Sequence, residues 1–420
     1  MTTVRTATPS TARAINDRLA LNLLLEQGPL TATELRGLTG LSRPTVADLL
    51  ERLQRTGLVA VVGERGEQRR GPNARLYALV ASRAHIAAID VRSVGVSLVV
   101  ADLAGRTLAG AELPVGRRSG GCDDDGDLDG GSDGDPGDGS DGGEPDRAVA
   151  ARIVRALLDT ARRVGVERLH TVAVGAPGLV DPATGRLNST GSLPGWHAEL
   201  LAALRELPDT DVILENEVNL AGRAEYRVGA ARDRDTFVLL WLGHSVGAAV
   251  ILDGRLRRGA SGGTGEICFL PVPGTGGLPT ATVSKGGFHS LAGSAAICDL
   301  ARAHGLPAGP ARDAPAAEAA VRAALAAGER GAAFLDELAA RIAVGAAAVC
   351  VVLDPGCVVL GGEIGRAGGA ELAGRVERRL AELSPLRTEV RPGTAGGGAI
   401  LSGAVLTAGD ALRRDLFGEP

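Results

Sequence analysis

The sequence has no uninterrupted apolar run of the roughly 18 residues that a membrane span needs. Its first residues, MTTVRTATPSTARAINDR, also lack the apolar core of a signal peptide. We therefore expect a cytoplasmic protein with no membrane partner. The five cysteines are scattered and form no Cys-x-x-Cys pair, which argues against a disulfide framework and against a zinc cage.

Lysine is almost absent, because Lys285 is the only one and arginine supplies the remaining positive charge. Arginine favours bidentate contacts with phosphate and carboxylate groups. The formal net charge is −5, but residues 122–146 hold eleven acidic side chains and no basic one, so the rest of the chain carries +6. The acidic total therefore does not exclude a nucleic-acid partner. With 420 residues, 45% of them hydrophobic, the chain is long enough for two or more globular units.

Residues 1–82 have the pattern of a winged helix-turn-helix. A first helix over 15–27 carries apolar residues at helical spacing on one face, namely Ile15, Leu19 and Leu23. The sequence TATE begins a second helix as a capping box, and Gly40 ends it. Ser42 can cap a third helix that runs to Gly57. The β-like runs LVAVV and ARLYALV then flank a polar loop, as the strands of a wing would.

The third helix and the wing carry the residues that we expect to contact DNA. Small polar side chains at the start of such a helix reach base edges, and wing arginines hold phosphates. The candidates are Ser42, Arg43, Pro44, Thr45, Arg65, Arg69 and Arg70. A basic loop is usually only solvated, and three helices can form a packing unit without a ligand. A basic wing that follows a helix with small polar side chains at its start favours DNA binding over these alternatives.

After the wing, β-rich runs alternate with helices, which predicts α/β layers. Three strands followed by helices and strands occur twice, so we expect two similar lobes with a ligand cleft between them. We place this domain at 83–420, with lobes at 83–212 and 213–420 and the C-terminal helix returning to the first lobe. Residues 118–147 are rich in Gly and Asp. They contain almost no apolar residues, so they are predicted to be a disordered insertion. They also lack the nine-residue period of calcium-binding repeats, which argues against a metal site.

Four segments, in the same order along the chain, resemble the ROK family of sugar kinases and transcriptional repressors. NDRLALNLLLEQGPLTATELRGLTGLSRPTVADLLERLQRTGLV resembles the DNA-binding domain of the repressor branch, which the kinases lack. VGAPGLVDPATGRLNSTGSLPGWH is similar to the sugar-lobe signature, and DGRLRRGASGGTGEI and LDPGCVVLGGEI match two further segments. The resemblance implies an N-terminal winged helix-turn-helix followed by a two-lobed α/β domain of the actin-like ATPase fold.

The resemblance also identifies two phosphate loops, and both depart from the family pattern. The family's Asp-x-Gly-Gly-Thr keeps only Asp90, with Arg92 at its first glycine. The second loop keeps Gly243 and Gly247 but has His244 at the hydroxyl position. Side chains in place of glycine obstruct the backbone's approach to phosphate, so we expect no active kinase and no nucleotide cofactor. The family's zinc-binding cysteines are missing as well, so no metal site is expected.

The family's sugar contacts carry over to Asn216, Glu217, Glu266 and His289. Asn216 and Glu266 match the family, Glu217 stands where the kinases have the catalytic Asp, and an ungapped alignment puts His289 at a Glu position. We hypothesise that these four residues bind an effector rather than act as catalysts. The alternative is that they are leftover polar groups of a structural lobe.

These patterns predict a DNA-binding transcriptional regulator of the repressor branch, acting on sugar-related genes. Its kinase-like domain would sense a sugar or sugar derivative and join chains into homodimers or homotetramers on double-stranded operator DNA. Two other interpretations stay open. One is an ATP-dependent carbohydrate kinase with an attached DNA-binding domain, and the other is a DNA-binding scaffold without an effector.

Overall fold

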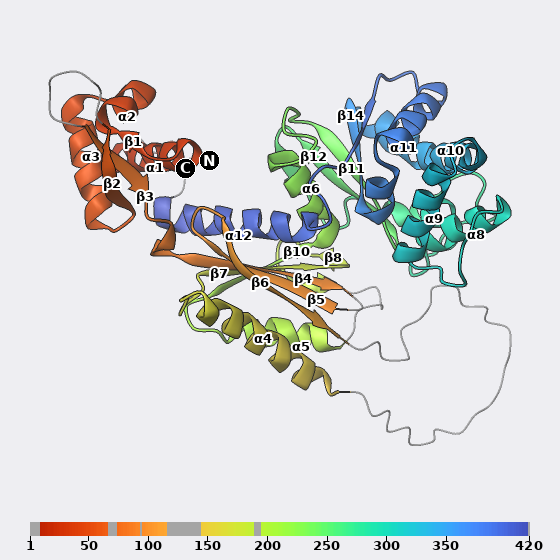
Figure 1. Ribbon diagram of the computed structural model, residues 1–420, viewed down its shortest axis with the longest axis horizontal. Helices are drawn as coiled ribbons and strands as arrows, with labels where there is room; N and C mark the ends of the chain where they lie inside the picture. Colours follow the sequence, from red (N-terminus) through yellow and green to blue (C-terminus); the bar gives the residue numbers. More distant parts are fainter. Residues whose placement is uncertain (1–8, 66–73, 93–94, 116–143, 189–194, 419–420) are drawn as a thin grey trace, which may run out of the picture.

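The computed structural model describes residues 9–65, 74–92, 95–115, 144–188 and 195–418. Along the chain it forms a winged-helix unit and two α/β lobes, with the last helix lying between the winged-helix unit and the lobes (Figure 1). Most of the predicted acidic insertion, and Arg69 and Arg70 of the wing, lie outside the described residues.

The winged-helix unit consists of three helices and a small antiparallel sheet with the strand order β1-β3-β2. Its elements are α1 (Pro9–Gln27), β1 (Leu30–Thr31), α2 (Ala32–Thr39), α3 (Arg43–Arg55), β2 (Val59–Arg65) and β3 (Ala74–Leu79). The capping box is confirmed, because the Thr31 hydroxyl accepts from Glu34 N at 3.2 Å and the Glu34 carboxylate accepts from Thr31 N at 2.8 Å. Gly40 ends α2 with a φ of 69°, a conformation that glycine adopts without strain.

The apolar face of α1 was assigned only in part correctly from the sequence, because Leu23 is partly buried against the core but the other two predicted residues are not. Ile15 and Leu19 are 53% and 40% exposed, whereas the buried residues of this helix are Ala20, Leu21 and Leu24. The two stripes differ by one residue, which is about 100° around a helix. Tertiary packing decides between them, because α1 lies against α2, α3, β3 and the last helix at once.

The two lobes share one strand plan. The first lobe's sheet has the order β10-β7-β4-β5-β6 and the second has β13-β12-β11-β14-β15. In each sheet, the three strands that come first along the chain pair antiparallel with one another. The two strands that come later in the chain are added in parallel. This repetition confirms the two similar α/β lobes that the sequence theme predicts.

The first lobe extends beyond the expected boundary at residue 212, because β10 pairs with β7 and completes the first sheet. Its elements are η1 (Ala81–Arg83), β4 (His85–Arg92), β5 (Gly95–Asp102), β6 (Thr107–Pro114), α4 (Asp146–Arg163), β7 (Thr171–Ala176), β8 (Leu179–Val180), β9 (Leu187–Asn188), α5 (Trp196–Arg205), β10 (Asp211–Asn216) and α6 (Glu217–Arg227). The remaining elements are β11 (Phe237–Leu242), β12 (Val246–Leu252), β13 (Arg255–Arg257), η2 (Ile267–Phe269), α7 (His289–Ala292), α8 (Ser294–Ala303), α9 (Ala314–Ala326), α10 (Glu329–Leu353), β14 (Cys357–Gly361), α11 (Gly362–Leu383), β15 (Glu389–Pro392) and α12 (Ala399–Phe417).

Helix α12 covers one face of the first sheet, and α4 and α5 cover the other (Figure 1). The buried apolar residues of α12 belong to one cluster that also includes Leu24 and Leu58 of the winged-helix unit and Leu220 of α6. Phe417, at the end of α12, is buried in the same cluster. A continuous apolar core therefore connects the winged-helix unit, the first sheet and α6.

Helices α6 and α12 pack in direct backbone contact. A methyl group added to Gly403 of α12 would lie 1.9 Å from the Leu220 carbonyl oxygen of α6. On the adjacent strand, a methyl group added to Gly175 would lie 2.8 Å from Leu220 and 2.9 Å from Ile400. Only residues without a Cβ fit at these two positions, so the spacing of the two helices is fixed by backbone atoms.

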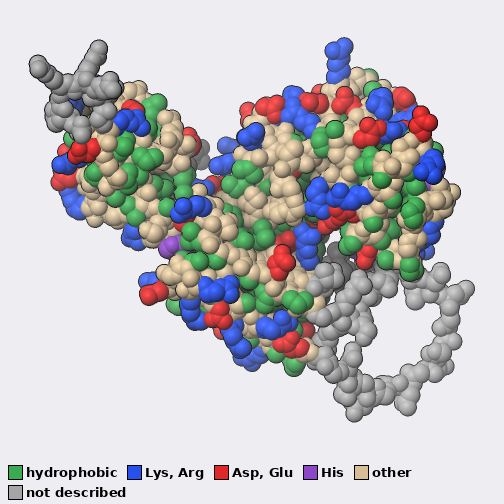
Figure 2. Space-filling view, in the orientation of Figure 1, with side chains coloured by type: hydrophobic (Ala, Val, Ile, Leu, Met, Phe, Trp, Pro, Cys, Tyr) green, Lys and Arg blue, Asp and Glu red, His purple; other side chains and the backbone are tan. Residues whose placement is uncertain are grey.

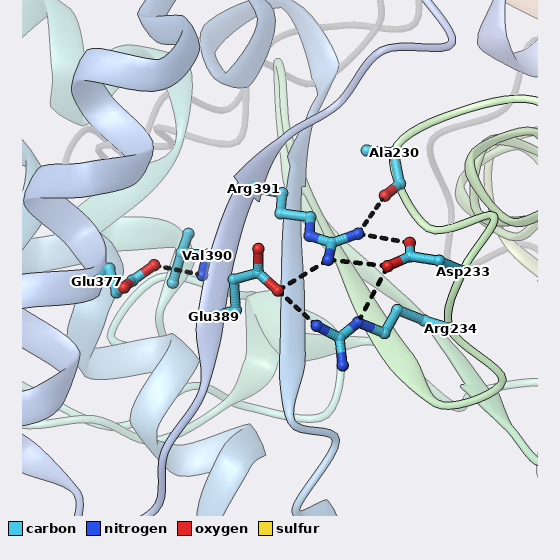
Figure 3. A network of polar contacts seen from close by, with 7 residues as sticks. All are labelled: Ala230, Asp233, Arg234, Glu377, Glu389, Val390 and Arg391. Atoms are coloured by element: carbon cyan, nitrogen blue, oxygen red, sulfur yellow. Dashed lines mark hydrogen bonds and ion pairs between the residues drawn. The ribbon is translucent and has the colours of Figure 1, made fainter.

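The edge strand β15 is held by charged groups (Figure 3). Arg391 donates to both carboxylate oxygens of Asp233, at 2.6 and 3.1 Å, and to Glu389 at 2.8 Å. Arg234 donates to the same Glu389 oxygen at 2.7 Å, and Glu377 accepts from Val390 N at 2.8 Å. The network joins the sheet edge to the segment after α6 and places charges where a bare edge would pair with another strand.

We expect Gly403→Ala to lower the free energy of unfolding by about 1 to 3 kcal/mol, because the added methyl must push α6 and α12 apart. Chemical denaturation of the full chain measures this. The matched control is Gly374→Ala in α11, where the nearest atom to an added methyl is the Arg378 guanidinium at 3.7 Å. That change should be neutral or stabilise by up to about 1 kcal/mol. Equal effects of the two changes would contradict the close packing.

Candidate functional site

The candidate DNA-binding residues at the start of α3 are exposed and locally fixed. Ser42 is the N-cap, as predicted, and its hydroxyl accepts from Thr45 N at 3.3 Å and lies 2.8 Å from the Thr45 hydroxyl. Pro44 occupies the first turn, where its fixed φ suits the helix. Arg43 and Pro44 are exposed. Capping thus orders the residues that would face a DNA groove, and the two hydroxyl groups are partly engaged with each other.

Arg65 of the wing has a partner inside the protein. It forms an ion pair with Glu34, the same carboxylate that closes the capping box of α2. Arg36 and Arg75 are exposed and were not singled out from the sequence. Figure 2 shows arginine side chains interspersed with acidic ones on the winged-helix unit. The described basic surface is therefore mixed. Arg36 lies within α2 and Arg75 within β3, and a single arginine inside a helix or strand carries no sequence signal that would have singled it out.

A second cluster of functional groups lies where the two lobes meet. Asp90 and Arg92 end strand β4 of the first lobe, and Glu217 begins α6. Glu363 begins α11 of the second lobe, and Glu266 directly precedes η2. The charges of Asp90, Arg92, Glu217 and Glu363 act on one another, and the charge of Glu266 acts on Glu217, which places the five residues in one electrostatic neighbourhood. We call them the cleft cluster.

Arg92 connects the two lobes within the cleft cluster. Its Nε donates to Asp90 Oδ2 at 3.0 Å, and its Nη1 donates to Glu363 Oε1 at 3.1 Å. Glu363 lies in the LGGEI segment, whose resemblance to the family was noted without assigning this residue a role. The structure therefore uses Arg92 as a bridge between two carboxylates and not as a solvated surface charge.

Three carboxyl groups of the cleft cluster, those of Asp90, Glu217 and Glu266, have raised pKa values. Burial, followed by the charge of Asp90, raises the pKa of Glu217 to about 7, while Arg92 opposes this shift. Burial also raises the pKa values of Asp90 and Glu266. Asp90 is only 4% exposed, and its second carboxylate oxygen, Oδ1, has no hydrogen-bond partner. Four carboxylates thus face a single arginine, and one buried oxygen lacks a donor.

Asn216, predicted as an effector ligand, performs a structural task. Its Oδ1 caps α6 by accepting from Val218 N at 2.9 Å and Asn219 N at 3.1 Å, and its Nδ2 donates to the Gly178 carbonyl at 3.0 Å. The neighbouring Glu215 is buried and forms an ion pair with Arg258 of the second lobe at 2.6 Å. Both residues fix the start of α6, and with it Glu217.

Two glycines fix the loop that carries Glu266. A methyl group on Gly262 would lie 2.1 Å from the Val180 carbonyl oxygen of the first lobe, and one on Gly265 would lie 1.9 Å from that of Ala248. Both have positive φ values, 83° and 95°, which favour glycine. The Cys268 thiol lies 3.6 Å from Glu266 Oε2, and burial raises the pKa of this thiol to about 12. The thiol therefore stays protonated and acts as a donor.

The second predicted phosphate loop is the turn between β11 and β12. His244 is exposed, and its ring Nδ1 lies 3.4 Å from the Ser294 hydroxyl. His289 begins α7, with its Nδ1 3.3 Å from the Ser245 hydroxyl of the same turn. Gly243 is enclosed, since an added methyl would lie 2.8 Å from Glu363 Oε2 and 2.9 Å from Trp241 Nε1. Gly247 similarly faces Val218 of α6, at 3.1 Å from an added methyl.

Within the described ranges, no three or more His, Cys, Asp and Glu side chains are arranged to hold a metal ion. No helix in this part of the chain is long and apolar enough to cross a membrane.

A two-lobed α/β domain with a cluster of carboxyl groups where the lobes meet, preceded by a winged helix-turn-helix, defines a sugar-kinase-like protein with an added N-terminal unit. Residues 145–410 match the ROK family, and residues 13–60 match the winged helix-turn-helix DNA-binding family. The chain therefore belongs to the ROK family.

Relatives include both enzymes and repressors. A ROK family transcriptional regulator, a homolog of the E. coli MLC protein, superposes with a TM-score of 0.71 at 20% identity, covering 97% of this chain and 98% of that one. The bifunctional enzyme NanE/NanK of Brucella melitensis is 36% identical over 37% of this chain and 27% of its own length. The xylose repressor of Bacillus subtilis is 21% identical over 62% of this chain and 61% of its own length. The chain thus spans less than two thirds of these two curated relatives.

The raised pKa of Glu217 predicts a dependence of stability on pH. The folded state holds the Glu217 proton up to about pH 7, whereas the unfolded chain releases it near the ordinary pKa of 4.5. This contribution is therefore fully present below pH 4.5 and is lost as the pH rises to about 7. At pH 8, Glu217→Gln should be more stable than the parent by up to about 3 kcal/mol. Urea denaturation between pH 4 and pH 8 measures the difference.

The matched control for this prediction is Glu199→Gln on the exposed side of α5. Its stability should follow the parent across the whole pH range. Parallel curves for Glu217→Gln and the parent would show that Glu217 ionises normally in the folded protein.

Proposed function

We propose that this chain is a cytoplasmic DNA-binding transcriptional regulator whose kinase-like lobes bind a sugar or sugar derivative without phosphorylating it. The observation that carries the proposal is the continuous apolar core from α6, at the cleft, through α12 to the winged-helix unit. Such a core gives a ligand in the cleft a mechanical route to the DNA-binding helices. The similarity to the xylose repressor and to a ROK transcriptional regulator supports the same function.

The proposal that the lobes do not transfer phosphate rests on the two loops that would hold a nucleotide. Gly243 is enclosed by Glu363 and Trp241, and Arg92 ties Glu363 to Asp90 across the cleft. A polyphosphate would have to break this bridge and enter a region with an excess of carboxylates. These residues do not fit a nucleotide.

Ligand binding would be coupled to DNA binding through the angle between the two lobes. Arg92–Glu363 and Arg258–Glu215 are ion pairs that cross between the lobes close to the start of α6. A ligand that bridges both lobes would favour one lobe angle, shift α6, and shift α12 with it. In a homodimer or homotetramer this movement would change the spacing of two winged-helix units on a palindromic operator. A chain without an effector would lack this response.

One observation favours the alternative of a carbohydrate kinase with an attached DNA-binding unit. Glu217 occupies the position of the catalytic Asp, and a pKa of about 7 suits a general base at neutral pH. Incubation of the purified chain with ATP, Mg²⁺ and a panel of hexoses decides between the two functions. Sugar-dependent release of ADP would establish the kinase.

DNA binding is tested with the chain's own promoter region. Arg43 is exposed at the first turn of α3, so we expect Arg43→Ala to weaken binding by about tenfold and to reduce the salt dependence of the affinity by roughly one phosphate contact. Fluorescence anisotropy at several salt concentrations measures both quantities. The matched control is Arg330→Ala, which removes an exposed arginine of the second lobe at the start of α10. Absence of salt-dependent binding by the parent would contradict the regulator function.

A further inference from the structure

The cleft cluster has an unbalanced charge. It contains the carboxyl groups of Asp90, Glu217, Glu266 and Glu363, and its only cation is Arg92. Arg92 is already committed, with Nε on Asp90 and Nη1 on Glu363. The nearby Arg258 cannot compensate the excess, because its guanidinium is paired with Glu215 at 2.6 Å. Glu217 and Glu266 are therefore left without a positively charged partner in the described structure.

A second feature points to a missing hydrogen-bond donor. Asp90 is 4% exposed, and Arg92 binds its Oδ2, but its Oδ1 is buried with no partner. Buried carboxylate oxygens nearly always accept hydrogen bonds, and the cost of leaving one without a donor is high. The charge of the same Asp90 contributes to the raised pKa of Glu217, so the two carboxyl groups belong to one electrostatic neighbourhood. A bound group that donates hydrogen bonds and carries positive charge would satisfy both.

We infer that the cleft binds an unphosphorylated polyol carrying a protonated amine, with its ammonium group held between Asp90 and Glu217. This inference rests on the proposed effector-sensing function and names the chemical class of the effector. An ammonium group offers three donors and one positive charge, which matches one buried oxygen without a partner and an excess of carboxylates. The polyol hydroxyls would bind to Glu266, whose loop is fixed by Gly262 and Gly265.

The same charges select against other ligands. A phosphorylated sugar would bring about two negative charges to a region where three carboxyl groups already have raised pKa values. A neutral hexose would leave the carboxylate excess in place. An N-acetylated amine has no positive charge and a single N–H donor.

Calorimetry on the full chain at pH 7 tests the inference with matched probes. Glucosamine and 6-amino-6-deoxyglucose place the amine at different ends of the same hexose, and glucose, N-acetylglucosamine and glucosamine 6-phosphate are the comparison ligands. We expect at least one of the two amines to bind about tenfold or more tightly than all three comparison ligands. The inference is overturned if glucose or a phosphorylated sugar binds as tightly as the amines, or if neither amine binds.

Two variants locate the ammonium group. Asp90→Asn removes the charge at the oxygen without a partner, and we expect it to reduce the preference for the amine over glucose from about tenfold to about threefold or less. Glu217→Gln should do the same and serves as the second variant if Asp90→Asn does not fold. The control Glu199→Gln, on the exposed side of α5, should retain the full preference. A preference that survives both cleft changes overturns the placement.

Promoter binding measured on the same preparation separates this inference from the proposed function. A chain that binds its promoter in a salt-dependent way but binds no amine overturns the ligand class and leaves the regulator function standing. A chain that prefers the amine but does not bind DNA overturns the regulator function and supports the ligand class.

Discussion

The backbone contact between α6 and α12 is the constraint on which the rest of the structure depends. Gly403 places one helix against the Leu220 carbonyl of the other, so neither can move independently without opening a gap in a close-packed interior. Helix α6 begins with Glu217 in the cleft, and α12 ends with Phe417 in the core shared with the winged-helix unit. The two helices together span the distance from the cleft cluster to the winged-helix unit.

The cleft shows how a kinase-like framework changes when side chains replace glycine in a phosphate loop. Arg92 turns a loop that would approach phosphate into an ion-paired bridge to Glu363, and the bridge holds the two lobes together without a ligand. The cost is a set of carboxyl groups with raised pKa values and one buried oxygen without a donor. The cleft cluster thus lowers the stability of the protein without a ligand, and a ligand bound there can restore that stability.

Local features of this chain could be predicted from the sequence, and features set by distant contacts could not. The capping box at Thr31, the N-cap at Ser42 and the repeated lobes follow from short patterns with clear physical causes. The predicted apolar face of α1 was wrong for Ile15 and Leu19, because packing against four neighbouring elements decides which face is buried. The Arg92–Glu363 pair joins residues 271 positions apart, and no spacing in the sequence indicates it. Asn216 matched a sugar-binding motif, but its use as the cap of α6 becomes visible only when the helix boundary is known.

The position of α12 in the chain also affects how the protein is made. Its residues 399–417 follow the whole second lobe, yet they cover one face of the sheet that residues 85–114 begin to build. During synthesis that face of β4 and β7 stays bare until these residues leave the ribosome, although the winged-helix unit emerges long before. The winged-helix unit therefore lacks its support on α12 until residues 399–417 have been made. A nascent chain that still lacks α12 carries an apolar sheet face in need of protection.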